Sequence, residues 1–194
     1  MFEKQDLSQI LEVALSQGGD FAEIFLEEKK TTGIACEDNK IERVVTGTDA
    51  GAGIRVLKGE NTLYAYTNDI SKKGLLEVAQ VISRAVQGKS QDLTLDLRKI
   101  KPELDFPILK RPDEVAIDEK VEVVQRANKT ARSVDEKIKQ VTVGYGDVIQ
   151  KVTIANSLGN VVEDERIRTR LVVNAVAAQG SDIQTGFEAL GGFA

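Results

Sequence analysis

The side chains with the clearest chemical potential are arginines that alternate along one stretch of the chain. Arg166, Arg168 and Arg170 are spaced two residues apart, and in an extended strand this spacing places all three on one side. Guanidinium groups bind carboxylates through paired hydrogen bonds. The pattern fits either a grip on a carboxylate or acidic partner segment, or an exposed strand face that carries solubilising charge. The sequence leaves both interpretations open.

The chain lacks the residues that most other catalytic mechanisms require. The 194 residues include no histidine, which excludes a Ser-His-Asp triad, a Cys-His pair and a His-ligated zinc built from this chain. Cys36 is the single cysteine, and without a neighbouring base it is expected to be an inert, partly buried thiol. We predict that this chain supplies no catalytic residue and no metal ligand.

Two further patterns resemble sites but have a plainer explanation. Acidic clusters such as Glu163-Asp164-Glu165 lack the spaced oxygen ligands of a calcium loop, and we expect them at solvated turns and strand ends. Gly47, Gly51 and Gly53 invite a phosphate-loop interpretation, but no Lys-Ser/Thr pair follows them and they lead into a strand. Phosphate loops open into a helix instead. These glycines therefore indicate a strand entry.

Three helices are predicted to position these groups, because apolar residues recur there at helical spacing. Gly18-Gly19 ends the first helix, Asp69 or Ser71 is available as N-cap of the second with Gly88 at its end, and Asp118 is the expected N-cap of the third. The apolar stripes are Leu7, Ile10, Leu11, Ala14 and Leu15; Leu75, Val78, Ala79, Ile82 and Val86; and Val121, Val124, Ala127, Ala131 and Val134.

The remaining regular segments are β-rich and come in runs rather than alternating with helices. Turns are expected at residues 38–39, 58–61, 144–147, 156–160 and 180–182. This order favours an α+β fold, with a mostly antiparallel or mixed sheet, about three helices packed on it and long curved strands in the second half. The predicted strands cover residues 21–28, 31–35, 41–45, 54–57, 62–67, 138–143, 148–155, 167–178 and 183–187.

The domain organisation is predicted from one break in this regularity. All three prolines of the chain lie between residues 102 and 112, and proline forbids helix interiors and central strands. We expect one domain of residues 1–194 with two lobes, residues 1–87 and 115–194, joined by an extended connector over residues 88–114.

Composition restricts the classes of partner. The formal net charge is -5, from 26 basic and 31 acidic residues, which disfavours nucleic acid or an anionic membrane as ligand. The N-terminal residues lack the apolar core of a signal peptide, and no run approaches membrane-spanning length. One cysteine fits a reducing compartment. We expect a cytoplasmic protein.

Several segments, taken in order, resemble the N-terminal region of the TldD/PmbA family, described as modulators of DNA gyrase and as zinc metallopeptidases. Each segment is short, but their order and spacing cover nearly the whole chain, and the last two resemble the TldD branch more than the PmbA branch. The segments span residues 18–24, 49–56, 64–68, 154–159, 168–173 and 185–188, followed by Gly191-Gly192.

The resemblance implies a function for the intact protein. TldD-type enzymes carry a His-Glu-x-x-x-His motif and a later cysteine ligand for zinc, downstream of the region matched here. The resemblance therefore implies an N-terminal domain whose catalytic C-terminal domain is absent from this chain, so that the chain alone is inactive. The intact protein would degrade unfolded peptides in the chamber of a homodimer, or of a heterodimer with a PmbA/TldE-type subunit. This domain would shape the substrate chamber and the dimer contacts.

A sheet edge can receive an extended peptide by strand addition, and Arg55, Arg168 and Arg170 are the residues predicted to steer it. The alternative is a non-catalytic interaction module, either a PmbA-like partner or a regulator of the gyrase-modulator type. Reading the gene past Ala194 separates the two, since the zinc motif downstream would support the peptidase and a stop codon the module.

Overall fold

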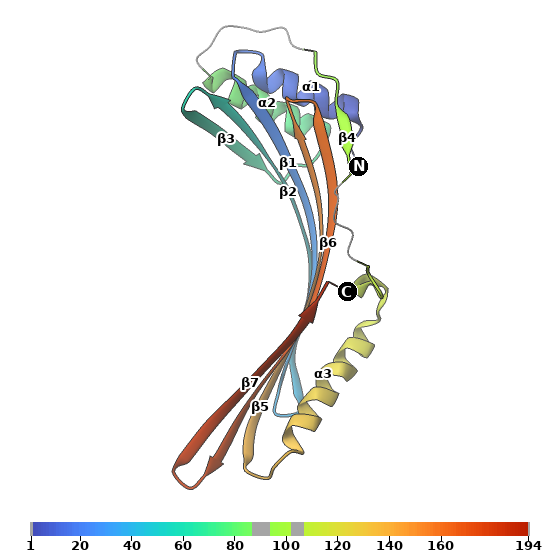
Figure 1. Cartoon of the computed structure of the whole chain (residues 1–194), viewed down its shortest axis with the longest axis vertical. Coiled ribbons are helices and arrows are strands. Elements are labelled where there is room, and N and C mark those ends of the chain that lie inside the picture. Colours follow the sequence, from blue (N-terminus) through green and yellow to red (C-terminus); the bar gives the residue numbers. More distant parts are fainter. Residues whose placement is uncertain (1, 87–93, 102–106, 194) are drawn as a thin grey trace. The chain divides into compact units, whose positions relative to one another are not determined.

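The computed structural model describes residues 2–86, 94–101 and 107–193. Three α-helices accompany a sheet of seven strands in the order β3-β2-β1-β5-β6-β4, with β7 paired to β6 (Figure 1). The pairs β2–β3 and β6–β7 are antiparallel and β4–β6 is parallel, so the sheet is mixed. The predicted α+β class is confirmed. The elements are α1 (Lys4–Leu15), β1 (Phe21–Glu37), β2 (Lys40–Lys58), β3 (Asn61–Thr67), α2 (Lys72–Ala85), β4 (Arg98–Ile100), the 3-10 helix η1 (Pro112–Glu114), α3 (Ile117–Arg132), β5 (Ile138–Asn156), β6 (Asn160–Gln179) and β7 (Asp182–Gly192).

The chain forms two compact units, and their segments interleave along the sequence. The first unit comprises Met1–Glu28, Asp49–Asp105 and Lys151–Glu165, and the second comprises Lys29–Thr48, Phe106–Gln150 and Arg166–Ala194. Strands β1, β2, β5 and β6 each contribute residues to both units.

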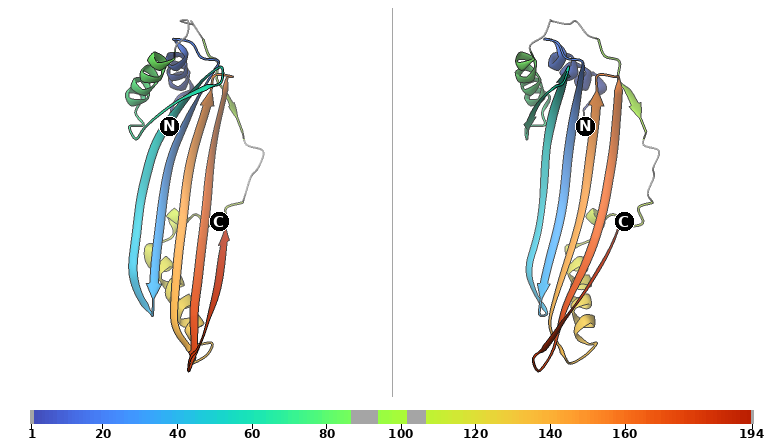
Figure 2. Two further views of the ribbon diagram at one scale, coloured as in Figure 1. Left: turned by 90° about the vertical axis from the view of Figure 1, so that its left-hand side faces the viewer. Right: turned by 60° about the vertical axis from the view of Figure 1, so that its left-hand side comes forward.

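In the first unit, α1 and α2 lie against one face of the sheet (Figure 2). The apolar stripe of α1 is fully buried, as its helical spacing predicts. The side chain of Ser71 caps α2 by accepting a hydrogen bond from the Gly74 amide at 3.1 Å. Gly88, predicted to end α2, lies outside the described residues, and the helix already ends at Ala85, followed by Val86 in an extended conformation. The core of this unit joins Leu7, Ile10, Leu11, Ala14, Leu15, Ala22, Ile24, Ala52, Ile54, Val56, Leu75, Ala79, Ile82, Val86, Leu97, Ala155 and Val161.

In the second unit, Val124 of α3 packs in a small apolar cluster with Ile34, Cys36, Val141 and Val143. Polar contacts add to this packing. The side-chain amide of Asn128, fully buried, donates to the Val141 carbonyl oxygen at 3.2 Å, and Arg132 forms an ion pair with Asp38. These contacts join α3 to Asp38 of the β1–β2 turn and to β5.

Three details of the prediction are wrong. Val134, predicted in the apolar stripe of the third helix, lies beyond the end of α3 at Arg132 and is 75% exposed. The turn expected at residues 144–147 does not form, because β5 runs unbroken from Ile138 to Asn156. Tyr145 and Asp147 continue the alternation of Val141 and Val143, so the inward face of the strand persists across the glycines. Nor is Asp118 the N-cap of α3: Ala116 holds that position, without a side-chain hydrogen bond, and Asp118 lies in the first turn.

The other predicted turns are confirmed by backbone geometry. Asp38 and Asn39 have φ values of 48° and 67°, the left-handed conformation that these two residue types tolerate. Gly59 (φ 58°) and Gly180 (φ 62°) turn the hairpins β2–β3 and β6–β7. The Asn156 side chain accepts hydrogen bonds from the amides of Leu158 and Asn160 and so closes the β5–β6 turn. Between the expected β-rich runs, β1 and β2 continue as single strands, and β2 includes the glycines of residues 47–53.

Candidate functional site

The three arginines predicted to steer a peptide occupy different parts of the structure. Arg55 lies on β2 in the first unit and donates a hydrogen bond to the Glu23 carboxylate at 3.0 Å. Arg168 and Arg170 lie on β6 in the second unit and are exposed. They make no ion pair with any described residue. The pairing with Glu23 offsets the charge of Arg55, so Arg168 and Arg170 are the stronger candidates for binding an acidic group.

The strand next to these arginines presents a long free edge. Among the described residues, β7 pairs with β6 alone, and all of its residues are exposed except the half-buried Ala189. Leu171, Val173 and Ala175 of β6 face α3, so their strand neighbours Arg170 and Asn174 face away from it. Their cross-strand partners are Gly191 and Phe187.

The face directed away from α3 is partly apolar. Ile183 and Phe187 are exposed to 64% and 65%, and by strand alternation they share this face with Arg170. Free main-chain donors and acceptors along β7, apolar side chains beside them and guanidinium groups on the next strand are the groups that bind an extended peptide.

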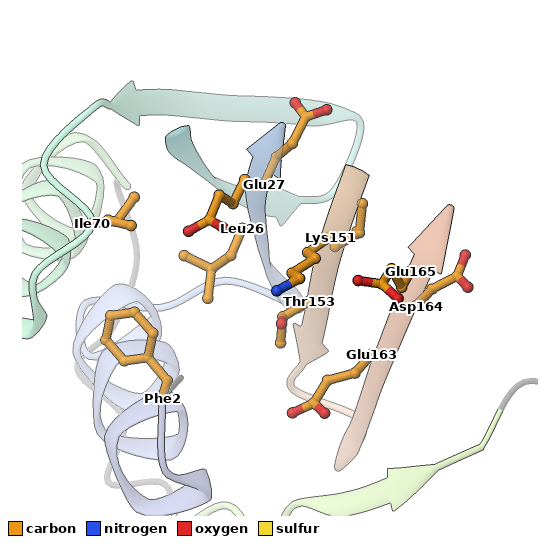
Figure 3. A pocket seen from close by; sticks show the side chains of 11 residues that line it. Phe2, Leu26, Glu27, Ile70, Lys151, Thr153, Glu163, Asp164 and Glu165 are labelled. Atoms are coloured by element: carbon orange, nitrogen blue, oxygen red, sulfur yellow. The ribbon is translucent and has the colours of Figure 1, made fainter. Parts of the chain in front are cut away.

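A pocket of about 520 Å³ opens in the first unit, on the face of the sheet that α1 and α2 cover. Phe2, Ile70 and Leu26 gather on one side of it, and charged residues of β5 and β6 on the other (Figure 3). Phe2 lies two residues before the start of α1, and Ile70 lies between β3 and α2. The pocket therefore begins where the two helices stop covering the sheet.

Strand alternation sets the polar part of this pocket. Glu163 lies two residues from the core residue Val161, so its side chain and that of Glu165 belong to the same face of β6. Lys151 is placed in the same way on β5, and its ammonium makes no hydrogen bond or ion pair with a described residue. Glu163 is paired with Lys99 of β4.

The acidic residues of the pocket outnumber its basic ones. Five acidic residues contribute atoms to its lining, Glu27, Glu28, Glu163, Asp164 and Glu165, against one basic residue, Lys151. The sequence placed the cluster Glu163-Asp164-Glu165 at a solvated strand end, and the pocket was not predicted. The segments that form it are far apart in the chain, so no local pattern identifies it.

A second polar cluster is buried under α3 in the other unit. The Lys120 ammonium donates to Asp147 Oδ2 at 2.6 Å, and both side chains are at least nine-tenths buried. The Tyr145 hydroxyl donates to the same oxygen at 2.8 Å. Burial, together with this hydrogen bond and the nearby negative charge, raises the pKa of Tyr145. The phenol therefore stays protonated and acts as a donor that helps to stabilise the Asp147 carboxylate.

Cys36 lies in the core of the second unit rather than in a cleft. Its side chain is fully buried, and burial raises the pKa of its thiol. A nucleophilic cysteine requires the opposite shift and an exposed thiolate. Cys36 is thus positioned for packing.

The described residues do not form a metal site. Within the part of the chain that the structure describes, no three His, Cys, Asp or Glu side chains converge as ligands, and the sequence supplies no histidine. A catalytic zinc site requires three protein ligands of this kind. No catalytic step through zinc follows from these residues.

Two family models match the chain in succession. The model for the "PmbA/TldA metallopeptidase domain 1" matches residues 22–101, and the model for the "PmbA/TldA metallopeptidase central domain" matches residues 110–194. Together they cover most of the chain. The chain belongs to the PmbA/TldD metallopeptidase family.

Individual relatives agree with this assignment. A metalloprotease of Methanocaldococcus jannaschii is 28% identical over 201 residues, covering 100% of this chain and 42% of the relative. A metalloprotease TldD homolog of Haemophilus influenzae is 22% identical, covering 97% of the chain and 39% of the relative. The chain therefore spans about two fifths of the length of these relatives.

Solved structures share the fold at low sequence identity. A protein of Thermotoga maritima described as a modulator of a DNA gyrase superposes with a TM-score of 0.77 at 19% identity, over 98% of this chain and 43% of that one. TldE of Thermococcus kodakarensis superposes with a TM-score of 0.73 at 19% identity, over 98% of this chain and 43% of that one.

The described helices include none with the length and apolar character needed to cross a bilayer.

Proposed function

We propose that this chain is the peptide-holding and subunit-contacting part of a TldD-like zinc metallopeptidase that degrades unfolded peptides. In this proposal the zinc motif lies in a part of the protein beyond the present chain. The enzyme works in the cytoplasm as a homodimer or as a heterodimer with a PmbA/TldE-type subunit. The observation that carries the proposal is the free edge of β7 beside Arg168 and Arg170.

The edge supports the proposal because its chemistry suits extended chains of varied sequence. Main-chain hydrogen bonds along β7 recognise any peptide without a fixed side-chain pattern, and folded proteins offer few free strands to pair with it. Ile183 and Phe187 then contact apolar side chains, which unfolded peptides expose. Arg168 and Arg170 attract a peptide carboxylate.

The proposal is tested in the intact protein with a peptide substrate. Replacing both Arg168 and Arg170 with Ala should raise KM about threefold to tenfold, because each charge-assisted contact at an exposed site contributes about 0.2–1 kcal/mol. Arg126→Ala is the matched control, an exposed arginine on α3 in the same unit. An unchanged KM in the double variant would remove both arginines from the site.

The catalytic half of the proposal has a separate test. A His-Glu-x-x-x-His motif encoded downstream of Ala194, together with zinc-dependent peptide hydrolysis by the full-length protein, is the expected result. A stop codon directly after Ala194 would favour the alternative, a non-catalytic module that acts by docking onto a partner subunit.

A further inference from the structure

The turn between β6 and β7 determines which main-chain groups of β7 are free. The two-residue turn Gly180-Ser181 joins Gln179 to Asp182, which are cross-strand partners, and the residues that flank such a turn form a hydrogen-bonded pair. Hydrogen-bonded and non-hydrogen-bonded pairs alternate along an antiparallel ladder. Every second residue of β7 therefore directs its N–H and C=O groups to the free edge rather than to β6, and these residues are Ile183, Thr185, Phe187, Ala189 and Gly191.

The residues with free main-chain groups also share a sheet face with Arg170. Gly191 pairs with Arg170 and Phe187 with Asn174, and both pairs, together with Ile183, lie on the side of the sheet directed away from α3. A peptide strand added at the free edge places the side chains of the residues opposite Gly191, Phe187 and Ile183 on this side as well. Each of these peptide side chains therefore has a defined neighbour.

At Gly191 the arginine can reach past β7 to the added strand. A side chain at position 191 would stand between Arg170 and the peptide, but glycine has none, and Arg170 Cγ lies 3.7 Å from the point that a Cβ there would occupy. The peptide strand would lie two strand spacings from β6, roughly 9.6 Å. The long guanidinium side chain and an acidic side chain opposite Gly191 together bridge this separation.

The charge on this face selects an acidic residue. Arg170 is exposed and makes no ion pair with a described residue. Residues 169–179 of β6 include no acidic residue, and the acidic residues of β7, Asp182 and Glu188, alternate onto the side of α3. Asp147 of β5 is buried and paired with Lys120. The charge of Arg170 is therefore not neutralised within the hairpin, and it attracts a carboxylate.

We propose that β7 selects extended peptides in which an acidic residue is followed by apolar residues four and eight positions later. The acidic residue lies opposite Gly191 and pairs with Arg170, and the two apolar residues lie opposite Phe187 and Ile183. This order corresponds to antiparallel pairing with β7, which is slightly more stable per residue than parallel pairing. The inference rests on the capture of peptides at β7 proposed above, and it adds the spacing and chain direction of the substrate.

The test measures the binding of labelled peptides to the purified chain by fluorescence anisotropy. The reference peptide carries Glu, with Leu four and eight positions later, among Ser, Thr and Gln residues, and both of its termini are blocked. A second peptide has Gln in place of Glu, a third has the reference sequence reversed, and a fourth is the Gln peptide with a free C-terminal carboxylate. The reference peptide should bind about threefold to fivefold more tightly than each of the others, the strength of an exposed ion pair.

A variant assigns this preference to one arginine. With Arg170→Gln, the Glu and Gln peptides should bind equally. Arg126→Gln is the matched control, an exposed arginine on α3 in the same unit, and it should retain the preference for Glu. Both substitutions replace exposed side chains, and circular dichroism of each variant verifies that the fold is retained.

Hydrogen exchange locates the bound peptide on β7. The amides that face the free edge should exchange more slowly when the reference peptide is bound, because they gain hydrogen-bond partners. The amides of residues 184, 186 and 188 are directed to β6 and should change little. The amides expected to slow are those of Ile183, Thr185, Phe187 and Ala189.

Two sets of results separate this inference from the capture of peptides itself. Equal binding of the Glu, Gln and reversed peptides, or a preference for Glu that persists in Arg170→Gln, would overturn the inference, and slower exchange along β7 would still support peptide capture. Absence of saturable binding by every peptide, with unchanged exchange along β7, would overturn peptide capture and the inference with it.

Discussion

Arg170 of β6 and Gly191 of β7 are cross-strand neighbours, so the position opposite the arginine carries no side chain. A Cβ atom at position 191 would lie 3.7 Å from Arg170 Cγ and 2.9 Å from the carbonyl oxygen of Thr169. The first distance is an ordinary contact, but the second is too short because the backbone of β6 is fixed by its pairing. Glycine at 191 therefore allows β7 to lie close to β6 at the arginine.

This close approach predicts different costs for two glycines of one strand. Gly191→Ala should lower the free energy of unfolding by about 1–2 kcal/mol, because the new methyl group forces the strands apart. Gly186→Ala is the matched control, since a Cβ there meets nothing within 4 Å, and its effect should stay within about 0.5–1 kcal/mol and can be stabilising. Urea denaturation of both variants gives the comparison. Equal effects would contradict the close approach of the two strands at position 191.

The buried pair under α3 predicts a large effect when one charge is removed. Lys120→Met leaves the Asp147 carboxylate buried without its counter-ion and should cost about 3–5 kcal/mol of unfolding free energy. Replacing both residues, Lys120→Met with Asp147→Leu, should recover most of this loss, because the unpaired charge is then gone. Chemical denaturation measures both variants.

The control for this prediction is Lys110→Met. Lys110 pairs with Glu119 at 3.3 Å, but both side chains are exposed, so the loss should be below about 1 kcal/mol. A Lys120→Met variant as stable as Lys110→Met would show that the buried pair does not hold α3 to β5.

The raised pKa of Cys36 predicts slow reaction with thiol reagents. Less thiolate is present at any given pH than for a free cysteine, whose pKa is about 8.5. The stability that this protonated thiol contributes is complete below about pH 8.5 and is lost as the pH rises toward the higher folded value. Unfolding free energy should therefore decline in this alkaline range.

A variant with an added exposed thiol provides an internal standard. In Ser181→Cys the new cysteine lies at the exposed tip of the β6–β7 hairpin. At pH 8 it should react with a disulfide reagent at least about a hundredfold faster than Cys36, which reacts only when the core opens. Two equally fast thiols would show that Cys36 is accessible.

Most of the fold prediction came from the alternation of inward and outward side chains along the strands. Its main error came from taking glycines as the mark of a turn. Gly144 and Gly146 suggested a turn, although Val141, Val143, Tyr145 and Asp147 keep one alternating face through them. Local propensity favours a turn at this place, but the buried contacts of Tyr145 and Asp147 favour the strand, and these contacts come from α3. A local sequence pattern cannot reveal a contact with a residue as distant in the chain as Lys120.

The two candidate sites also differ in how far the sequence alone could predict them. Arg168 and Arg170 could be placed on one strand face from their spacing alone, and the structure places both on the exposed face of β6. The pocket of the first unit could not be predicted, because Phe2 and Ile70 belong to no acidic motif. They reach Glu163 and Glu165 only through the packing of α1 and α2 on the sheet.

Because four strands pass through both units, recombination between related genes is restricted. The segment matched as the first family domain, residues 22–101, carries Ile34 and Cys36, which belong to the core of the second unit. It lacks Ala155 and Val161, which complete the core of the first. Recombination at the boundary between the two matched domains would therefore damage both cores at once, so the two halves can be exchanged between relatives only as a pair.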